Sequence, residues 1–251
     1  ETPSAVYFHV PKFRNYSRLS RQPLAKQMAG ARDEVVVDRE KKHPADFALW
    51  FKLAGRYKNH IMRWPSPWGA GFPGWHIECS AISSKYLGQP FDIHTGGIDH
   101  LTAHHPNEIA QSEAAYGKPL ARFWLEGEHL LVDGRKMSKS LGNFYTLRDV
   151  KARGFDPLDF RYFVLGAHYR SSLNFTWAAL EAARTARLGI LNTIERLRRG
   201  LFVGHLTDEN EVLKVAAAAE KQFQAAVEDD LNTPRALAVL NEVLHYANAM
   251  A

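Results

Sequence analysis

Short apolar runs alternate with helical stretches over the first 150 residues of this chain, and this alternation constrains the fold more than any other feature. Buried strands are expected at 91–94, 120–125 and 129–132, and helices at 77–87 and 107–116, each helix being followed by a glycine. Strands that alternate with helices are typical of a parallel α/β sheet with right-handed crossovers. The expected fold class is therefore α/β.

The pattern changes after about Asp149, where long helical periodicities begin. Helices are expected at 177–199, 211–228 and 234–251, the last one capped by Asn232 or Thr233. These stretches predict a helical bundle that follows the sheet.

The N-terminal 45 residues differ from both regions, because proline and glycine interrupt a largely polar sequence. Strands at 6–8 and 34–37 and a helix at 23–30 are expected there, and the whole region resembles an insertion rather than a core. Residues 64–74 contain too much proline and glycine for regular structure. They predict a rigid loop that carries tryptophans.

The composition excludes several classes of protein. With 251 residues, 45% hydrophobic and 24% charged, the chain has the composition of one or two globular domains. No apolar run approaches the roughly 18 to 20 residues of a membrane span, and no signal pattern opens the chain, so we expect a cytoplasmic protein without a membrane partner. The single cysteine, Cys79, is a buried spacer, a reactive thiol or a metal ligand.

The positive charge is concentrated in one segment. The formal net charge is +5, and residues 135–170 hold eight Lys or Arg against three Asp, interleaved with aromatic residues. This pattern fits a basic surface whose aromatic residues belong to the core. It also fits a track for a phosphate backbone.

Residues 134–143, GRKMSKSLGN, form a glycine-flanked segment with two lysines three positions apart. A mobile loop of this kind suits a polyphosphate leaving group, because lysines, hydroxyls and backbone N–H groups share the negative charge. A Lys/Ser loop is more often a solvated turn. The string KMSKS, however, resembles the signature loop of class I aminoacyl-tRNA synthetases.

Three further strings lie upstream of this loop: GWHIECSA at 74–81, FDIHTGGIDH at 91–100 and HHPNEIAQSE at 104–113. In order and spacing they resemble cysteinyl-tRNA synthetases. The resemblance implies a class I catalytic domain that activates L-cysteine with ATP and Mg²⁺ and transfers it to tRNA(Cys), in a monomeric enzyme with one zinc ion.

Cys79, His104 and Glu108 form a candidate metal set. His104 and Glu108 are four residues apart at the start of an expected helix, so both side chains can face one ion, and a thiolate, an imidazole and a carboxylate are acceptable zinc ligands. The residues alone are also compatible with a purely structural role, and His105 is an alternative to His104 as the ligand. The resemblance matches these positions to three of the family's four zinc ligands and favours His104. The fourth ligand, a second cysteine, is absent from this chain.

The remaining site residues also follow from the resemblance. Gly96 and Gly97 come after an expected strand and would let ATP approach the backbone. Asp99 would hold the α-ammonium group of the amino acid, and Trp75 and His94 would line its pocket. Lys139, assisted by Lys136, would stabilise the departing pyrophosphate as catalytic residues.

The family also has a His-Ile-Gly-His element that contacts ATP, and this string does not occur here. We therefore expect the chain to be the middle of a longer enzyme, with little activity when isolated. The expected divisions are the end of a connective insertion at 1–45, the second half of the catalytic domain at 46–150, a tRNA-stem contact at 151–180 and the start of an anticodon-side helical domain at 181–251.

Two other functions stay open. One is the related ligase that joins activated cysteine to an amino-sugar in mycothiol synthesis, which resembles the synthetases in the same loop and zinc set. The other is a non-catalytic paralogue or split subunit that binds tRNA. The basic aromatic segment after Asn143 and the helix beyond Pro234 favour a tRNA substrate over an amino-sugar.

Overall fold

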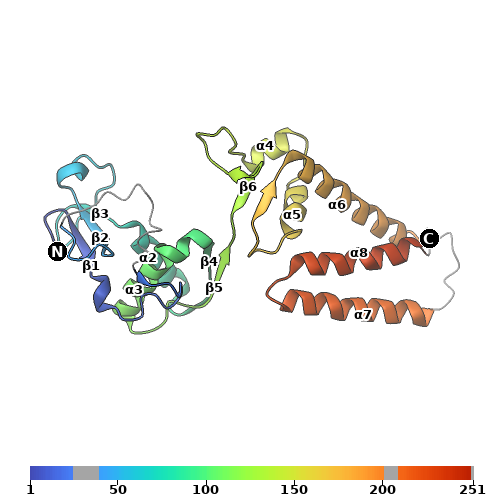
Figure 1. Ribbon diagram of the computed structural model, residues 1–251, viewed down its shortest axis with the longest axis horizontal. Helices are drawn as coiled ribbons and strands as arrows, with labels where there is room; N and C mark the ends of the chain where they lie inside the picture. Colours follow the sequence, from blue (N-terminus) through green and yellow to red (C-terminus); the bar gives the residue numbers. More distant parts are fainter. Residues whose placement is uncertain (25–39, 201–208, 250–251) are drawn as a thin grey trace. The chain divides into compact units, whose positions relative to one another are not determined.

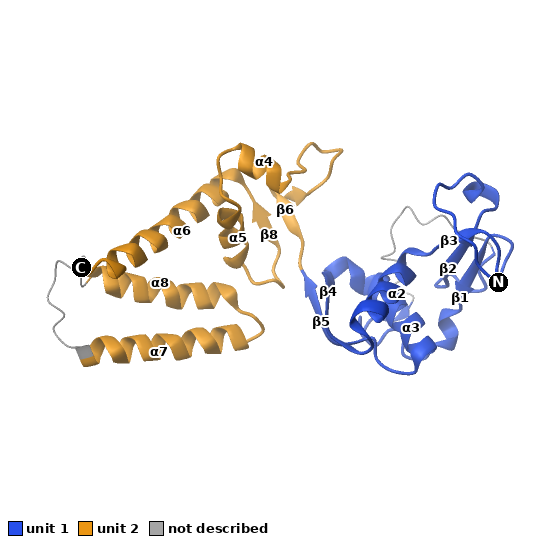
Figure 2. Ribbon diagram, turned by 180° about the vertical axis from the view of Figure 1, so that it is seen from behind, with its two compact units in different colours: residues 1–127 blue, residues 128–251 orange. Residues whose placement is uncertain are grey.

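The computed structural model describes residues 1–24, 40–200 and 209–249. They form two compact units, Glu1–Gly127 and Glu128–Ala251 (Figures 1 and 2). The expected strand at 34–37 lies outside the described residues, as does most of the expected helix at 23–30. Among the described helices, none combines the length and the apolar character that crossing a membrane requires.

An antiparallel sheet opens unit 1. Its strands are β1 (Ala5–Phe8), β2 (Phe47–Lys52) and β3 (Gly71–Pro73), in the order β1-β2-β3, with short 3-10 helices η1 (Val10–Lys12) and η2 (Gly55–Tyr57). The prediction that 64–74 has no regular structure is wrong for β3. Phe72 pairs with Phe51 of β2 and stacks on its ring at 5.1 Å, and Pro73 is tolerated because β3 is an edge strand.

The rest of unit 1 is the expected α/β arrangement. Its elements are α2 (Trp75–Leu87), β4 (Phe91–Gly97), η3 (Ile98–Thr102), α3 (His104–Tyr116) and β5 (Ala121–Gly127). β4 and β5 are parallel, with Ile93 opposite Phe123, and α3 makes the crossover between them (Figure 1). The parallel strands and both helices are confirmed. The expected burial of the strands is wrong, since Ile93 of β4 is 58% exposed and Phe123 of β5 is 64% exposed.

α3 begins three residues before the predicted start at 107. Its first half is buried although it is polar, with His105 and Glu108 both fully buried. Hydrophobic periodicity marks helices that bury apolar side chains, and it therefore misses a helix start that buries histidines. The far end agrees with the sequence: Gly117 adopts a left-handed conformation (φ 66°), and its N–H donates to the Glu113 carbonyl at 2.8 Å.

Unit 2 contains a second small sheet. Its strands are β6 (Leu130–Val132), β7 (Arg135–Lys136) and β8 (Leu173–Phe175), in the order β7-β6-β8, with β6 and β8 parallel. The sequence analysis assigned no strand after Asp149 and so missed β8, which has only three residues and pairs with β6. The expected single sheet is instead three small sheets in the described residues.

Helices complete unit 2: α4 (Leu147–Ala152), α5 (Pro157–Leu165), α6 (Trp177–Arg198), α7 (Glu209–Glu228) and α8 (Thr233–Ala249). α7 and α8 form a hairpin (Figure 2). Of the two cap candidates for α8, Asn232 is confirmed, because its Oδ1 accepts from the N–H of Arg235 at 3.2 Å. The core lies between the sheet and α4 to α6, and its buried residues are Val132, Val150, Phe163, Phe175, Leu180 and Ala183.

Candidate metal centre and signature loop

The candidate metal centre lies between α2 and α3 of unit 1. The Gln111 side chain of α3 joins the helices, since its Nε2 donates to the carbonyl of His76 at 2.7 Å and to Ser80 Oγ at 2.6 Å. This pair of bonds holds the first turns of α2 against α3. Cys79 on α2 therefore faces the start of α3.

The structure brings the three predicted ligands together. One possible ligand atom from each of Cys79, His104 and Glu108 lies within 4.8 Å of the others, and His104 and Glu108 share a helix face as their spacing predicts. His105 forms a different group, with His94 and Glu108. The geometry thus separates the two neighbouring histidines, and it is His104 that lies beside the thiol.

Glu108 is a fully buried carboxylate with histidines on several sides. Its oxygens lie 3.0 and 3.1 Å from His94 Nε2, and Oε2 lies 3.5 Å from His104 Nε2 and 3.8 Å from His105 Nε2. A buried carboxylate is costly unless hydrogen bonds and positive charge compensate it. A divalent cation at the Cys79–His104–Glu108 group is one source of that charge.

Burial and neighbouring ionisable side chains set the protonation of the two non-acidic candidate ligands, His104 and Cys79. Desolvation, followed by the rings of His100, His105 and His94, lowers the pKa of His104 to about 4, so this ring is neutral at pH 7. Burial, followed by Glu108 and Glu78, raises the pKa of the Cys79 thiol. Without a metal, the site at neutral pH thus holds a neutral imidazole and a protonated thiol.

His76 forms a hydrogen bond with the Nδ1 atom of His104. The two Nδ1 atoms lie 2.9 Å apart, and burial lowers the pKa of His76 to about 3, so the rings are neutral and one Nδ1–H donates to the other. When His104 is the donor, its Nε2 carries no proton and is available to a metal. This role of His76 is not evident from the sequence, where its only signal is its position next to Trp75 in the quoted string.

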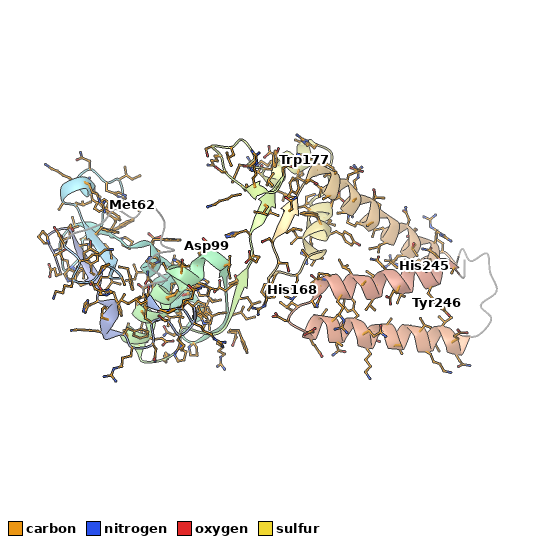
Figure 3. The ribbon with its side chains drawn as sticks, in the orientation of Figure 1. Met62, Asp99, His168, Trp177, His245 and Tyr246 are labelled. Atoms are coloured by element: carbon orange, nitrogen blue, oxygen red, sulfur yellow. The ribbon has the colours of Figure 1, made fainter. Side chains whose placement is uncertain are left out.

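Aromatic rings and an exposed aspartate border the centre. Trp75, half-exposed at the start of α2, stacks on His104 with ring centroids 4.4 Å apart, and His94 packs against Trp124 at 4.7 Å. Asp99 lies exposed in η3 (Figure 3). Trp75, His94 and Asp99 thus border the region that holds the three candidate ligands.

The two glycines at the end of β4 make room for side chains of this chain. A Cβ on Gly96 would collide with the rings of His100 and His105, and one on Gly97 would collide with the Asp99 carboxylate. His105 is fixed in turn by Glu126 of β5, whose Oε1 lies 2.6 Å from its Nδ1. His100 and Glu126 are further residues of the centre that sequence reasoning missed.

The signature loop, residues 134–143, belongs to unit 2. It begins in the turn of the β6–β7 hairpin and continues beyond β7. The hairpin turns at Asp133 and Gly134, which both have positive φ (50° and 73°), and the Gly134 N–H donates to Asn174 Oδ1 at 2.7 Å. Lys136 and Lys139 are both exposed, and the Lys139 ammonium lies 5.6 Å from the centre of the Phe144 ring. Both lysines are accessible to an anionic ligand.

Asn143 closes the loop. Its Oδ1 accepts from the Ser138 N–H at 2.8 Å, and its Nδ2 donates to the Lys136 carbonyl at 3.1 Å. Ser138 and Ser140 share a hydrogen bond of 2.7 Å between their hydroxyls. Asn143 belongs to the motif, yet only the fold shows that its side chain connects the two ends of the loop.

Two families match the chain. The catalytic domain of tRNA synthetases class I (C) matches residues 1–185, about three quarters of the chain, which include both the candidate metal centre and the signature loop. The chain belongs to the class I tRNA synthetase family. The DALR domain matches residues 222–251, from the end of α7 through α8.

Several relatives of this class I synthetase chain are cysteine–tRNA ligases. Cysteine–tRNA ligase of Treponema denticola is 45% identical over 94% of this chain and 50% of its own length. The enzyme of Thermus thermophilus is 46% identical over 96% of this chain and 48% of its own length, and cysteine–tRNA ligase 1 of Burkholderia lata is 48% identical over 95% and 48%. The resemblance stated from the motifs is confirmed. The chain spans about half the length of these relatives.

A solved structure agrees on the fold. The Agrobacterium radiobacter K84 LeuRS, crystallised in a ternary complex with tRNA and LeuAMS, matches with a TM-score of 0.58 and 20% identity, over 75% of this chain and 29% of that one. At this identity the match supports the class I fold alone. The described elements are accordingly α/β with a helical C-terminal region.

Proposed function

We propose that the protein to which this chain contributes activates L-cysteine with ATP and transfers the cysteinyl group to tRNA(Cys). The observation that carries this proposal is the group of Cys79, His104 and Glu108, whose ligand atoms lie within 4.8 Å of one another. Such a group suits a substrate that binds through sulfur. The names of the relatives agree with this substrate and do not favour a mycothiol ligase or a non-catalytic paralogue.

The donor set fits zinc. It combines a thiol, a neutral imidazole and a buried carboxylate, with His76 positioned to hold the His104 proton on Nδ1. Zinc bound by Cys79, His104 and Glu108 would supply a soft Lewis acid that prefers the substrate thiolate to a hydroxyl, so that cysteine is selected over serine. Zinc therefore suits the chemistry of these residues.

The residues around the centre would bind the rest of the amino acid. Asp99 is exposed and takes part in none of the ion pairs among the described residues, so its carboxylate is available to the substrate ammonium. Trp75 covers one face of His104 and would exclude water from that side, and His94 would line the pocket. Gly96 and Gly97 would form the backbone side of the ATP site.

The signature loop would act on the phosphates of ATP, which binds with Mg²⁺. Negative charge grows on the pyrophosphate as the cysteine carboxylate attacks the α-phosphate, and the cations of Lys139 and Lys136 stabilise that charge in the transition state more than in the ground state. The tRNA ribose hydroxyl then attacks the carbonyl of the adenylate, forms the cysteinyl ester and displaces AMP. This step needs no side-chain nucleophile. The cytoplasmic location, the monomeric state and the four sequence divisions stay predictions.

Cobalt substitution tests the cysteine site directly. Cobalt(II) occupies zinc sites and gives a charge-transfer band when a thiolate binds it. We expect the 251-residue chain, loaded with cobalt, to gain intensity in this band on addition of L-cysteine and to show no change with L-serine. The response measures the substrate contact separately from ATP and tRNA.

One variant at a candidate ligand and one control variant test where the cobalt binds. His104→Asn should lose cobalt binding, whereas His129→Asn, at an exposed histidine of unit 2, should bind cobalt as the unchanged chain does. Equal responses to cysteine and serine, or full cobalt binding by His104→Asn, would contradict the proposed site. In the whole enzyme, cysteine-dependent exchange of pyrophosphate into ATP tests the activation step.

A further inference from the structure

A cavity lies in unit 2 beside the signature loop. Its volume is about 160 Å³, and its wall combines side chains of β6, β8, α4 and α5 with residues in and just after the loop (Figure 2). β6 supplies Leu130, β8 supplies Phe175, α4 supplies Val150 and α5 supplies Phe160. The metal centre belongs to unit 1, so this cavity is a separate feature.

The wall of the cavity is apolar. Apart from Tyr145 and Thr146, the residues that line it have hydrocarbon or thioether side chains. The Thr146 hydroxyl is already engaged, since it donates to Asp149 Oδ2 at 2.6 Å and accepts from the Asp149 N–H at 3.3 Å. The Tyr145 ring packs against Phe175 and Trp177, with ring centroids 6.0 and 5.0 Å apart. The wall therefore carries no charge and favours a ligand without one.

The volume of the cavity limits the size of its ligand. An apolar cavity of about 150 Å³ stays dry, because water finds no hydrogen-bonding partner in it, and it admits benzene or xenon. Drug-sized ligands need pockets of about 300 Å³ or more. The present cavity of about 160 Å³ thus fits a single aromatic ring, and the tilted rings of Phe160 and Phe175, 6.2 Å apart, offer edges and faces to such a ring.

Met137 connects the cavity to the signature loop. It lies between Lys136 and Ser138, and its half-buried side chain both lines the cavity and packs against the core of unit 2. Tyr145, on another part of the wall, comes two residues after Asn143, at the far end of the loop. A ligand in the cavity therefore contacts both sides of the loop. It stabilises the loop position in which Met137 packs against the core.

We propose that this cavity binds a small uncharged aromatic molecule, of the size of toluene, and that the bound molecule holds the signature loop in place. The ring contacts Phe160 and Phe175 and lies against the Met137 thioether, a favourable pairing of sulfur with an aromatic ring. Because Lys136 precedes Met137 directly and Lys139 follows two residues later, a held loop brings these cations to the pyrophosphate less readily. The cavity is thus an inhibitory site. This last consequence rests on the proposed function, whereas the binding rests on the cavity alone.

Methyl NMR of methionine tests the binding in the full 251-residue chain. Its four methionines include Met137 at the cavity and Met62, which is 37% exposed in unit 1 (Figure 3). With isotope-labelled methionine methyl groups, toluene should shift the Met137 signal saturably, with a Kd on the order of 1 mM. The Met62 signal should not move, because a ring shifts only the signals of nearby atoms, and Met137→Leu identifies the signal of Met137. Benzoate should have no effect, because the wall cannot compensate its charge.

Cavity-filling substitutions separate this site from non-specific apolar binding. Val150→Phe occupies much of the cavity and should weaken toluene binding about tenfold or more, whereas Val150→Ile adds one methylene and should weaken it about threefold. Val164→Phe makes the larger change at a 41% exposed valine of α5 outside the cavity, and it should bind toluene like the unchanged chain. Val150→Ile decides the matter if the larger side chain prevents folding. Unchanged binding by the folded Val150 variants, or equal shifts of Met62 and Met137, would overturn the inference.

Limited proteolysis tests whether the ligand holds the loop. Saturating toluene should slow tryptic cleavage after the exposed Lys136 and Lys139 and leave cleavage after the exposed Lys58 of unit 1 unchanged. Bound toluene with unchanged cleavage at all three lysines would refute the connection between cavity and loop. In the whole enzyme, toluene should slow cysteine-dependent exchange of pyrophosphate into ATP, and an unchanged rate would refute the inhibitory role. The NMR and proteolysis results need no catalysis, so a failure of this inference and a failure of the proposed function are distinguishable.

Discussion

Zinc uptake should release about one proton near neutral pH, and this proton should come from Cys79. The pKa of the Cys79 thiol is raised from 9.0 by burial and by Glu108 and Glu78, so the thiol is protonated below that pH and must lose its proton to become a ligand. The pKa of His104 is lowered to about 4, so this ring is already neutral above about pH 5 and releases nothing.

The protonation of Cys79 and His104 sets how steeply the zinc affinity depends on pH. Because its pKa is raised, the thiol keeps its proton in the metal-free protein at neutral pH and loses it when zinc binds. A rise in pH therefore favours the metal-bound form. One released proton makes the affinity increase about tenfold for each pH unit, or roughly 1.4 kcal/mol, between about pH 5.5 and pH 7.5. Over this window the zinc affinity should therefore rise about 100-fold.

Titration calorimetry in two buffers of different ionisation enthalpy counts the released protons. Cys79→Ser should remove the pH dependence together with most of the affinity, whereas His129→Asn, at an exposed histidine, should change neither. A release of two protons below pH 6 would show that His104 is charged in the free protein. A release of none would show that Cys79 is not a ligand or is already a thiolate.

Three further predictions concern unit 2. In the whole enzyme, Lys139→Ala should slow adenylate formation about 100-fold in pyrophosphate exchange, and an unchanged rate would remove the Lys139 cation from the mechanism. Asn143→Ala removes the hydrogen bonds of 2.8 and 3.1 Å that close the signature loop. Trypsin should therefore cleave the variant after Lys139 faster than the unchanged chain, which mass spectrometry can follow. Equal cleavage rates would show that the loop does not depend on these two hydrogen bonds. Asp159→Asn breaks a buried ion pair with Arg187 (2.7 Å) and should lower the free energy of unfolding, measured in urea, by about 3 kcal/mol. Asp229→Asn, which breaks an exposed ion pair, should change it little. Equal urea midpoints for the two variants would contradict this prediction.

Much of the fold could be predicted because its elements follow local rules. α2 and β4 form near the residues that the sequence predicts, with α2 ending before Gly88, and Asn232 caps α8 as its residue type predicts. The strand β8 could not be predicted, because three residues carry no period of their own and become a strand only through β6. The start of α3 could not be predicted either, because it buries polar side chains.

By itself, the sequence indicated the class I synthetase family through the string of 134–143, and it predicted a metal site at Cys79, His104 and Glu108. Only the tertiary structure decided how that site is arranged. It places His104 rather than His105 beside Cys79, and it adds His76 and Glu126 as the groups that hold the two imidazoles. The physical reason is that residue type and helical spacing are local properties, whereas the orientation and protonation of a buried ring depend on side chains that distant segments bring into contact with it.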